Sequence, residues 1–305
     1  MKYIPLGSTD LQVSRWCFGC ATIGGYDYGP ADDAESIAAV RRAVDLGVTF
    51  FDTADVYGFG RAERILREAL GPRIRDLVIA TKFGVGWTVE GKTYRDLSPA
   101  HLRAALEGSL TRLGLETIPL YQIHWPDSRT SWEDCMAELQ NCQAEGKIRH
   151  IGACNLSIDN LQACLGVGRL ESLQVPFSLA EQQHRPALEY AVSSQMTTLG
   201  YNILAHGFFT GKFGSQSTFS GTDLRGRIPL LTEGNRGRVF ALLERIRAAS
   251  TITGLTPAQV AIGWALAQSA LNVVLVGARS AQQVEESAGQ VDTALSAEAL
   301  TLLDG

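Results

Sequence analysis

The sequence predicts an α/β protein, a (β/α)8 TIM barrel that forms one domain over residues 1–305. Three observations predict this fold. Apolar runs of strand length alternate with helical patterns along the whole chain. The runs are almost continuously hydrophobic, as in parallel strands that are covered on both faces. No linker interrupts the series, and barrels of this length are commonly single domains. The eight expected strands are Trp16–Gly19, Val48–Ala54, Leu77–Phe83, Leu120–Trp125, Ile148–Cys154, Leu173–Phe177, Thr198–Leu204 and Val273–Gly277.

The segments between these runs carry helix start and stop signals. Ser98 is placed to cap a helix that opens with a proline, and Gly114 follows its last leucine. Another helix ends at Gly71, before a proline. Within that helix, Glu63 and Arg67 stand four residues apart, so we expect them to form an ion pair.

An open doubly wound sheet is the competing architecture. Such a sheet usually carries a G-x-G-x-x-G loop after its first strand, and this chain has none. Residues Gly58–Glu63 lack the third glycine, and Gly207–Phe213 fall short of a P-loop. The barrel is therefore favoured.

The segment Ala205–Gly234, after the seventh expected strand, is long and irregular. Loops of this length inside a compact domain are functional or disordered. On a barrel this loop lies at the C-terminal face, where it is either a lid over a ligand or a surface excursion.

Composition excludes several classes of partner. The net charge of −5 gives no reason to expect nucleic acid or an anionic membrane. The six cysteines include one C-x-x-C, Cys17 to Cys20, but lack a second pair or histidines at zinc-ligand spacing, so we expect reduced core thiols and no metal. There is no apolar leader and no membrane-length apolar run, which predicts a cytoplasmic protein.

Polar residues interrupt or end several of the apolar runs. Asp52, Lys82 and His124 do so in the second, third and fourth expected strands, and Tyr57 follows the second in a glycine-containing loop. Taken singly, such residues are commonly helix caps, packing groups or satisfied core residues. Because barrel active sites lie at the C-terminal ends of the strands, the four together indicate a catalytic site.

Four motifs in this order resemble the aldo-keto reductases. They are Phe51–Gly58 (FDTADVYG), Ala80–Gly84 (ATKFG), Ile123–Asp127 (IHWPD) and Glu145–Gly152 (EGKIRHIG). The similarity extends over essentially the whole chain and is strongest to the bacterial inositol-operon and potassium-channel β-subunit-like branch. It implies an NADPH-dependent oxidoreductase on a (β/α)8 barrel, which interconverts an aldehyde or ketone and an alcohol by hydride transfer.

The resemblance assigns a role to each of the four polar residues. Tyr57 is the expected proton donor to the developing alkoxide. Lys82 would favour the phenolate of Tyr57, and Asp52 would pair with Lys82. His124 would orient the substrate oxygen by a hydrogen bond.

The resemblance also implies the residues that bind NADPH or NADP+. Tyr201 would stack on the nicotinamide, and Asn155 with Gln174 would bind its carboxamide. Arg279 would bind the 2′-phosphate, which suits a guanidinium. The full expected set is Gly19, Cys20, Ala21, Asp52, Cys154, Asn155, Gln174, Tyr201, Asn202, Leu204, Gly207, Lys212, Gly277, Arg279, Gln283 and Glu286.

The chain departs from the family pattern around the cofactor. Cys154 replaces the usual serine, Asn202 and Ile203 replace Ser-Pro, Val276 replaces proline and Ser287 replaces asparagine. Two interpretations stay open: neutral change, or altered cofactor affinity or specificity.

The substrate is not predicted beyond a small carbonyl compound or alcohol. Tyr26, Tyr28, Trp87 and Trp125 are candidates to line its pocket, although each can instead pack its own loop. Two further functions stay open: an NADPH-sensing regulatory subunit with slow turnover, and a dedicated sugar or secondary-metabolite reductase or dehydrogenase. Both a monomer and a homo-oligomer are compatible with the sequence.

Overall fold

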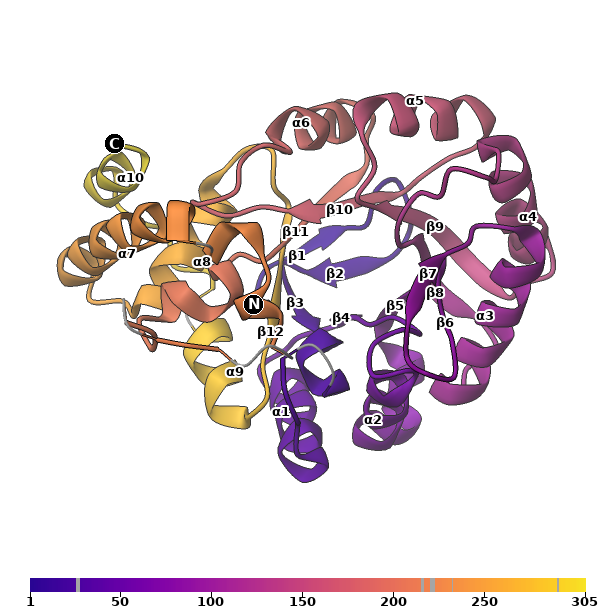
Figure 1. Cartoon of the computed structure of the whole chain (residues 1–305), viewed down its shortest axis with the longest axis horizontal. Coiled ribbons are helices and arrows are strands. Elements are labelled where there is room, and N and C mark those ends of the chain that lie inside the picture. The colour runs from indigo at the N-terminus through magenta and orange to yellow at the C-terminus, as the bar shows by residue number, and fades with distance from the viewer. Residues whose placement is uncertain (26–27, 215–216, 220–222, 232, 290) are drawn as a thin grey trace.

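Eight parallel strands close into a barrel, which confirms the fold predicted from the sequence (Figure 1). The structure is a computed structural model and describes residues 1–25, 28–214, 217–219, 223–231, 233–289 and 291–305. The barrel closes between its last strand and its first, where Leu275 lies opposite Cys17. The barrel strands are β3 (Trp16–Gly19), β4 (Phe50–Asp52), β5 (Val78–Phe83), β8 (Ile118–Ile123), β9 (Ile148–Cys154), β10 (Ser172–Pro176), β11 (Thr197–Tyr201) and β12 (Val273–Gly277).

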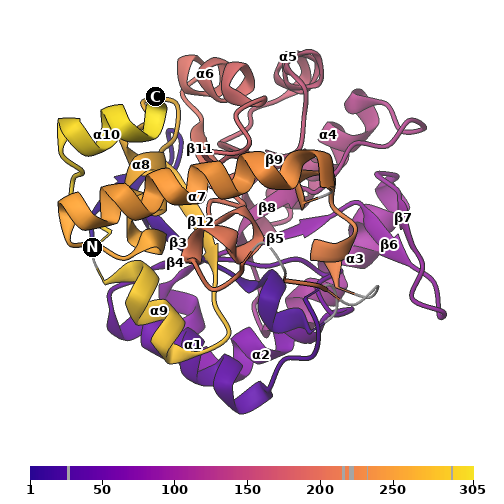
Figure 2. The same cartoon turned by 60° about the vertical axis from the view of Figure 1, so that its left-hand side comes forward.

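Helices surround the barrel, and each barrel strand before β12 leads to the next barrel strand through at least one of them (Figures 1 and 2). This arrangement covers the strands on both faces and explains why their sequences are almost entirely apolar. The helices are α1 (Asp33–Asp45), α2 (Arg61–Leu70), α3 (Pro99–Leu113), α4 (Trp132–Ala144), α5 (Ile158–Val167), α6 (Arg185–Ser193), α7 (Glu233–Thr253), α8 (Pro257–Ala267), α9 (Ala281–Ala288) and α10 (Ala297–Asp304).

The core has two layers. A large outer layer fills the space between strands and helices, and a smaller inner layer, with Phe50 and Leu120, fills the barrel. A hairpin of β1 (Tyr3–Pro5) and β2 (Gln12–Ser14) adds Leu6 and Val13 to the inner layer. This hairpin covers the end of the barrel at which the strands begin, where the Gly7 backbone donates to Thr197 at the start of β11.

The local signals of α3 are confirmed, whereas the expected ion pair in α2 is wrong. The Ser98 side chain accepts from the backbone N–H of His101, and Gly114 is left-handed. Glu63, however, pairs with Arg112 of α3 at 2.5 Å, and Arg67 donates to the Thr111 carbonyl instead. Glu63 lies on the fully buried face of α2, so its carboxylate needs partners inside the barrel wall.

The seventh strand ends earlier than expected, at Tyr201. Asn202 adopts φ 58°, a left-handed conformation that cannot continue a strand. The long loop that follows is confirmed at the C-terminal face, and its described parts form three short 3₁₀ segments, η3 (Ala205–Thr210), η4 (Leu224–Gly226) and η5 (Pro229–Leu231). Helix α7 then leads away along the outside of the barrel (Figure 2).

A second hairpin, β6 (Val85–Trp87) and β7 (Thr93–Arg95), follows β5 and was not expected from the sequence. All six cysteines are buried and unpaired. Within the described part of the chain, no helix is both long and apolar enough to cross a membrane. A cytoplasmic location stays a prediction.

Candidate active site

Asp52, Tyr57, Lys82 and His124 meet at the C-terminal ends of three neighbouring strands. Asp52 ends β4, Lys82 is the penultimate residue of β5, and His124 follows β8 directly. Lys82 Nζ lies 2.5 Å from Asp52 Oδ1 and 3.2 Å from the Tyr57 hydroxyl. The Tyr57 and His124 rings are edge to face, with centroids 5.7 Å apart. The structure therefore brings all four predicted residues together.

Every donor of the Lys82 ammonium is used. Besides Asp52 and Tyr57, Lys82 Nζ donates to the carbonyl of Thr53 at 2.8 Å. The second oxygen of Asp52 accepts from the side-chain amides of Gln122 and Gln174, at 2.9 and 2.8 Å. The buried charges of Lys82 and Asp52 thus compensate each other and are fully hydrogen-bonded, which is the condition for stable burial of an ion pair.

Burial and neighbouring charges together set the protonation of Lys82, Tyr57 and His124. Burial opposes the charge of Lys82, but Asp52 and then Tyr57 stabilise the ammonium, so the pKa of Lys82 is raised. Burial raises the pKa of Tyr57 to about 12, although Lys82 acts in the opposite direction. Burial, and then the charges of Lys82 and Arg95, lower the pKa of His124 well below its usual value. Around neutral pH the site holds a phenol, an ammonium and a neutral imidazole.

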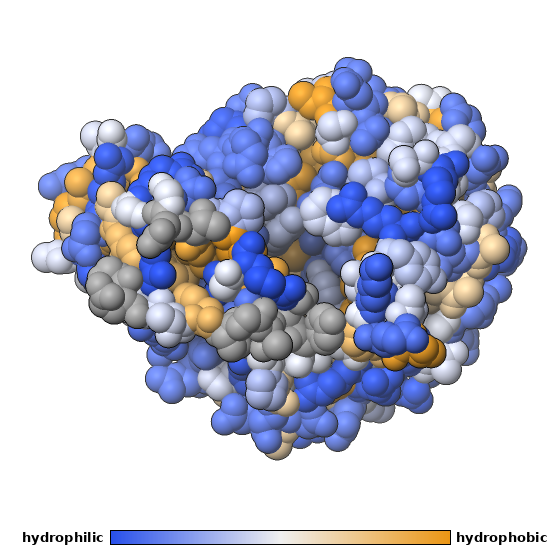
Figure 3. All heavy atoms as spheres, viewed as in Figure 1, coloured by the Kyte–Doolittle hydropathy of each residue, from blue (hydrophilic) through white to orange (hydrophobic). Residues whose placement is uncertain are grey.

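A cavity of about 610 Å³, the inner cavity, opens above these residues. Asp52, Tyr57 and His124 line its base, together with Trp125 and Tyr201. Apolar residues of the loop after β11 cover one side of it; they are Leu224, Ile228, Pro229 and Leu230. Figure 3 shows the molecule hollowed near the middle of the face viewed in Figure 1, with both hydrophilic and hydrophobic residues at the rim.

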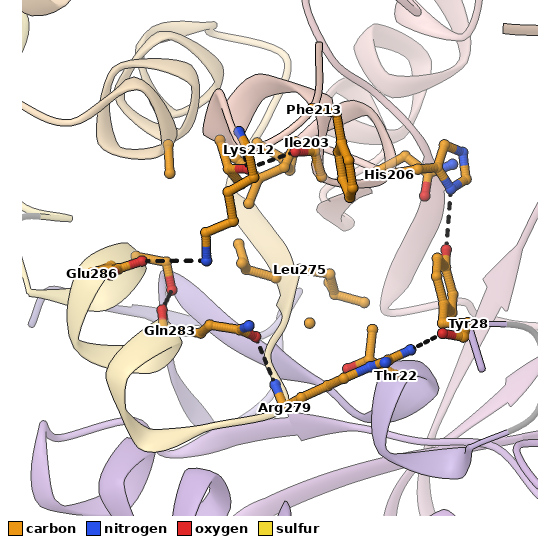
Figure 4. Close-up of a pocket in the computed structure, with 18 of the residues that line it drawn as sticks. Thr22, Tyr28, Ile203, His206, Lys212, Phe213, Leu275, Arg279, Gln283 and Glu286 are labelled. Carbon is orange, nitrogen blue, oxygen red and sulfur yellow. Dashed lines mark hydrogen bonds and ion pairs between the residues drawn. The ribbon is translucent and has the colours of Figure 1, made fainter. Parts of the chain in front are cut away.

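A second cavity of about 270 Å³, the outer cavity, lies between the loop after β11 and α9. Its wall holds the cations Lys212, Arg225 and Arg279. Figure 4 shows Lys212 and Arg279 on opposite sides of this cavity. The Arg279 backbone donates to Gln283 Oε1 at 2.9 Å, and its guanidinium bonds to the Tyr28 carbonyl. Lys212 reaches toward Glu286, with Nζ 3.9 Å from Oε2. A wall with these cations and the Gln283 amide suits a ligand that carries an anionic group beside an uncharged polar group.

The two cavities adjoin each other, because six residues line both. The shared residues are Thr22, Tyr28, Asn202, His206, Leu275 and Gly277. The inner cavity has Tyr57 in its lining, and the outer cavity has Arg279.

Most predicted cofactor residues line one cavity or the other. Gly19, Ala21, Asn155, Gln174 and Tyr201 line the inner cavity, whereas Leu204, Gly207, Lys212, Arg279, Gln283 and Glu286 line the outer one. The Tyr201 hydroxyl donates to Asn155 Oδ1 at 2.8 Å, which orients both side chains. Cys20 and Cys154 are fully buried behind the wall, and Cys154 Sγ lies 3.8 Å from Gln122 Oε1.

The candidate substrate residues are distributed differently. Trp125 lines the inner cavity, Tyr28 lines both cavities, and Trp87 packs against Phe59 without lining either cavity. Tyr26 lies outside the described residues. Sequence reasoning missed Gln122 and His206. Gln122 was detectable as an amide inside an apolar strand, whereas nothing in the sequence around His206 marks it.

Comparison with known proteins decides the family. A model of the Aldo/keto reductase family matches residues 15–305. The chain belongs to the aldo/keto reductase family. It is therefore an oxidoreductase of the class that acts on carbonyl and alcohol groups.

Several aldo/keto reductases are similar over nearly their whole length. Aldo-keto reductase YhdN of Bacillus subtilis (strain 168) is 33% identical over 290 residues, which cover 93% of this chain and 87% of the relative. An NADH-specific methylglyoxal reductase of Escherichia coli (strain K12) is 31% identical over 322 residues, covering 99% and 97%. The structure of the glycerol dehydrogenase AKR11B4 from Gluconobacter oxydans superimposes with a TM-score of 0.91 at 33% identity, covering 99% and 94%.

No group of three or more His, Cys, Asp or Glu side chains that could hold a metal ion occurs within the described ranges.

Proposed function

We propose that the protein is an NADP(H)-dependent oxidoreductase that interconverts an aldehyde or ketone with an alcohol, with Tyr57 as the proton donor in reduction. The bound cofactor supplies or takes up the hydride. The observation that carries the proposal is the direction of the hydrogen bonds around Tyr57. An ammonium has only donors, so in the bond between Lys82 and Tyr57 the phenol oxygen is the acceptor. The phenol proton is left to be donated into the inner cavity.

Lys82 also makes Tyr57 a better acid than its buried position alone allows. When Tyr57 gives up its proton, the ammonium stands 3.2 Å from the new phenolate and stabilises it. Asp52 holds that ammonium in place from the other side. A positioned general acid of this kind contributes on the order of 10²–10⁴ in rate.

His124 is placed to orient the substrate oxygen. Its Nδ1 is buried and has no hydrogen-bond partner among the described residues. A neutral imidazole carries one proton, and a proton on Nδ1 would leave a buried donor without an acceptor, so Nε2 is favoured as the donor. Nε2–H can then donate to a carbonyl oxygen that also receives the proton of Tyr57.

The outer cavity supports NADP(H) as the cofactor. Arg279 and Lys212 are cations in its wall, and a 2′-phosphate needs such partners. Among the relatives, aldo-keto reductase yakc of Schizosaccharomyces pombe carries NADP(+) in its name at 31% identity, whereas the Escherichia coli reductase is named NADH-specific. Membership of the family therefore does not by itself predict which nicotinamide cofactor is used, and the argument for NADP(H) rests on the residues of this chain.

Tyr57→Phe tests the proposal, because it removes the proton and keeps the ring. We expect reduction of aldehydes and ketones to fall by at least about 10²-fold while NADPH still binds with nearly unchanged affinity. Turnover would be followed as loss of NADPH absorbance with a panel of carbonyl compounds, and binding as NADPH fluorescence. Full turnover of every substrate by the variant would exclude Tyr57 as the donor. Tight NADPH binding by the wild type without turnover of any substrate would favour a sensor instead.

A further inference from the structure

The two cavities differ in the sign of their charged residues. Three cations line the outer cavity, and Figure 4 shows two of them, Lys212 and Arg279. Among the described residues that line the inner cavity there is no Lys or Arg, and the carboxylates are Asp52 and Glu181. The charge of Asp52 is compensated by Lys82 at 2.5 Å. Glu181 is therefore the carboxylate that sets the sign of the inner cavity.

The carboxylate of Glu181 is only partly satisfied by the protein. Its Oε2 atom is buried and has no hydrogen-bond partner among the described residues. Gln183, which also lines the inner cavity, hydrogen-bonds to this carboxylate. Arg238 of α7 acts on Glu181 through its charge, but its guanidinium donates to the Ala180 carbonyl at 2.8 Å. Burial raises the pKa of Glu181, which means that these groups do not fully compensate its charge.

A tight turn after β10 holds Glu181 in place. The backbones of Ser178 and Glu181 exchange hydrogen bonds of 2.9 and 3.1 Å across this turn. The Ser178 hydroxyl accepts from the N–H of Ala180 at 3.2 Å. Leu179 and Ala180 are buried in the outer layer of the core, so the turn is packed as well as hydrogen-bonded. The backbone that carries the carboxylate is thus fixed before a ligand arrives, which lowers the entropic cost of binding.

Glu181 and the proton-donating group of the cavity come from different parts of the barrel rim. Glu181 follows β10, and its charge raises the pKa of Tyr201 at the end of β11. His124 follows β8, which β9 separates from β10. Burial, and then neighbouring positive charge, lower the pKa of His124. A carbonyl oxygen at Tyr57 and His124 therefore meets positive potential, whereas Glu181 supplies negative potential elsewhere in the same cavity.

We propose that the substrate is an aldehyde or ketone that also carries a protonated amine, and that this ammonium group pairs with Glu181 while the carbonyl oxygen faces Tyr57. The product of reduction is the corresponding amino alcohol. The carbonyl carbon takes up the hydride, its oxygen takes up the proton of Tyr57, and the ammonium group is unchanged. The proposal rests on the proposed function, since it names the class of substrate for that reaction.

The chemistry of the inner cavity favours a cation over other polar groups. A buried carboxylate is stable when a cation pairs with it, and an N–H of an ammonium group also satisfies the free Oε2 atom of Glu181. The faces of Trp125 and Tyr201 in the same lining attract a cation as well. A carboxylate on the substrate would instead be repelled by Glu181. The proposal thus predicts selectivity by charge.

Steady-state reduction of three para-substituted benzaldehydes by the wild type with NADPH tests this selectivity. The para-(dimethylaminomethyl) compound is a cation at neutral pH, para-isobutylbenzaldehyde is its uncharged isostere, and the para-(carboxymethyl) compound is an anion. We expect kcat/KM for the cation to exceed that for the isostere by about 10- to 100-fold, because hydrogen bonds between charged groups are strong, and the anion to be the poorest substrate. Equal values for cation and isostere, or a higher value for para-(hydroxymethyl)benzaldehyde, would overturn the proposal.

Glu181→Gln tests the residue, because it removes the charge and keeps the shape of the side chain. We expect kcat/KM for the cation to fall by about tenfold or more, mainly through a higher KM, since the ion pair is present in the ground state and the transition state alike. The value for the isostere should stay within about twofold, which also shows that the variant is folded. Unchanged selectivity would exclude Glu181 as the partner of the amine. An equal loss with both substrates would show a purely structural role and would also overturn the proposal.

Glu189→Gln is the matched control, because Glu189 is exposed on α6 and lines neither cavity. Its selectivity should equal that of the wild type. Wild-type protein that reduces no carbonyl compound with either nicotinamide cofactor would overturn the proposed function and the cationic substrate together. Reduction of the three aldehydes without preference for the cation would overturn the cationic substrate alone.

Discussion

Hydrogen-bond direction at single residues determines the chemistry of the site. Lys82 donates its three hydrogen bonds to Asp52, Thr53 and Tyr57. The Tyr57 oxygen is therefore an acceptor toward Lys82, and its own proton is available to another acceptor. His124 stays neutral because burial and the nearby positive charge both oppose protonation. The proposed reduction of a carbonyl needs one proton donor and one neutral hydrogen-bond donor at the oxygen, beside the hydride that the cofactor would supply.

The pKa shifts of these residues predict the pH dependence of reduction. Tyr57 must be protonated, and its pKa of about 12 keeps it so through neutral pH. The pKa of His124 is lowered, so its usual titration near pH 6.5 is absent. We expect kcat for reduction to be flat between about pH 6 and 9 at saturating substrate and cofactor. An inflection near pH 6.5 that disappears in His124→Gln would contradict this assignment.

At the scale of elements, a buried polar cluster links α2, α3 and β5. Glu63 of α2 accepts from Thr81 of β5 at 2.7 Å and pairs with Arg112 of α3. Thr81 is the residue before Lys82, so the cluster holds the strand that carries this ammonium. Asp55 lies close to Glu63, and burial, and then the charge of Glu63, raise the pKa of Asp55 to about 8.

Breaking this cluster should destabilise the fold. Glu63→Gln leaves Arg112 without its carboxylate partner, and we expect the free energy of unfolding to fall by about 2–3 kcal/mol. The expected loss is below that of a fully buried pair because Arg112 is partly exposed. Urea denaturation of Glu63→Gln, Arg112→Met and the double variant would measure these losses. The double variant should lose less than the sum of the single variants.

Arg42→Met, in the exposed pair with Glu285, should change stability little. Equal losses at both pairs would contradict the role of burial.

For the whole molecule, the barrel brings positive charges together locally although the net charge is negative. The chain carries a net charge of −5, yet Lys212, Arg225 and Arg279 line one cavity, where Glu286 is the carboxylate of the lining and Arg225 pairs with Asp223 at 2.6 Å. Arg279 lies far from the other two cations in the sequence and meets them because the loops after β11 and β12 are neighbours in the barrel. An anionic cofactor can therefore bind to a protein of the same overall sign.

Cofactor binding should stabilise the whole protein by mass action. NADPH at about 100 times its dissociation constant adds about 2.7 kcal/mol, which we expect to raise Tm by several degrees. In Arg279→Ala the shift caused by NADPH should fall much more than the shift caused by NADH, because only NADPH carries the 2′-phosphate. Thermal unfolding with each cofactor measures both shifts, and exposed Arg73→Ala is the control. Equal loss for the two cofactors would show that Arg279 does not bind the 2′-phosphate.

Local pattern was sufficient for the barrel and for the position of four polar residues at the ends of its strands. Buried parallel strands need continuous apolar runs, so a charged residue within one, such as Lys82, is visible in the sequence. The wrong ion pair in α2 shows the limit of such reasoning. Spacing along a helix brought Glu63 and Arg67 to one side, but burial of that side gave Glu63 the closer partner Arg112.

The sequence by itself determined the eight-stranded barrel, its long loop after the seventh strand and the four residues at its mouth. Only the tertiary structure decided which groups face one another. In the folded chain, Gln122 and Gln174 donate to Asp52. Trp87 packs against Phe59 away from the cavities, and the Tyr28 hydroxyl lies beside His206. The reason is physical: hydrophobic periodicity depends on neighbours in the chain, whereas hydrogen bonds across a barrel join residues more than a hundred positions apart.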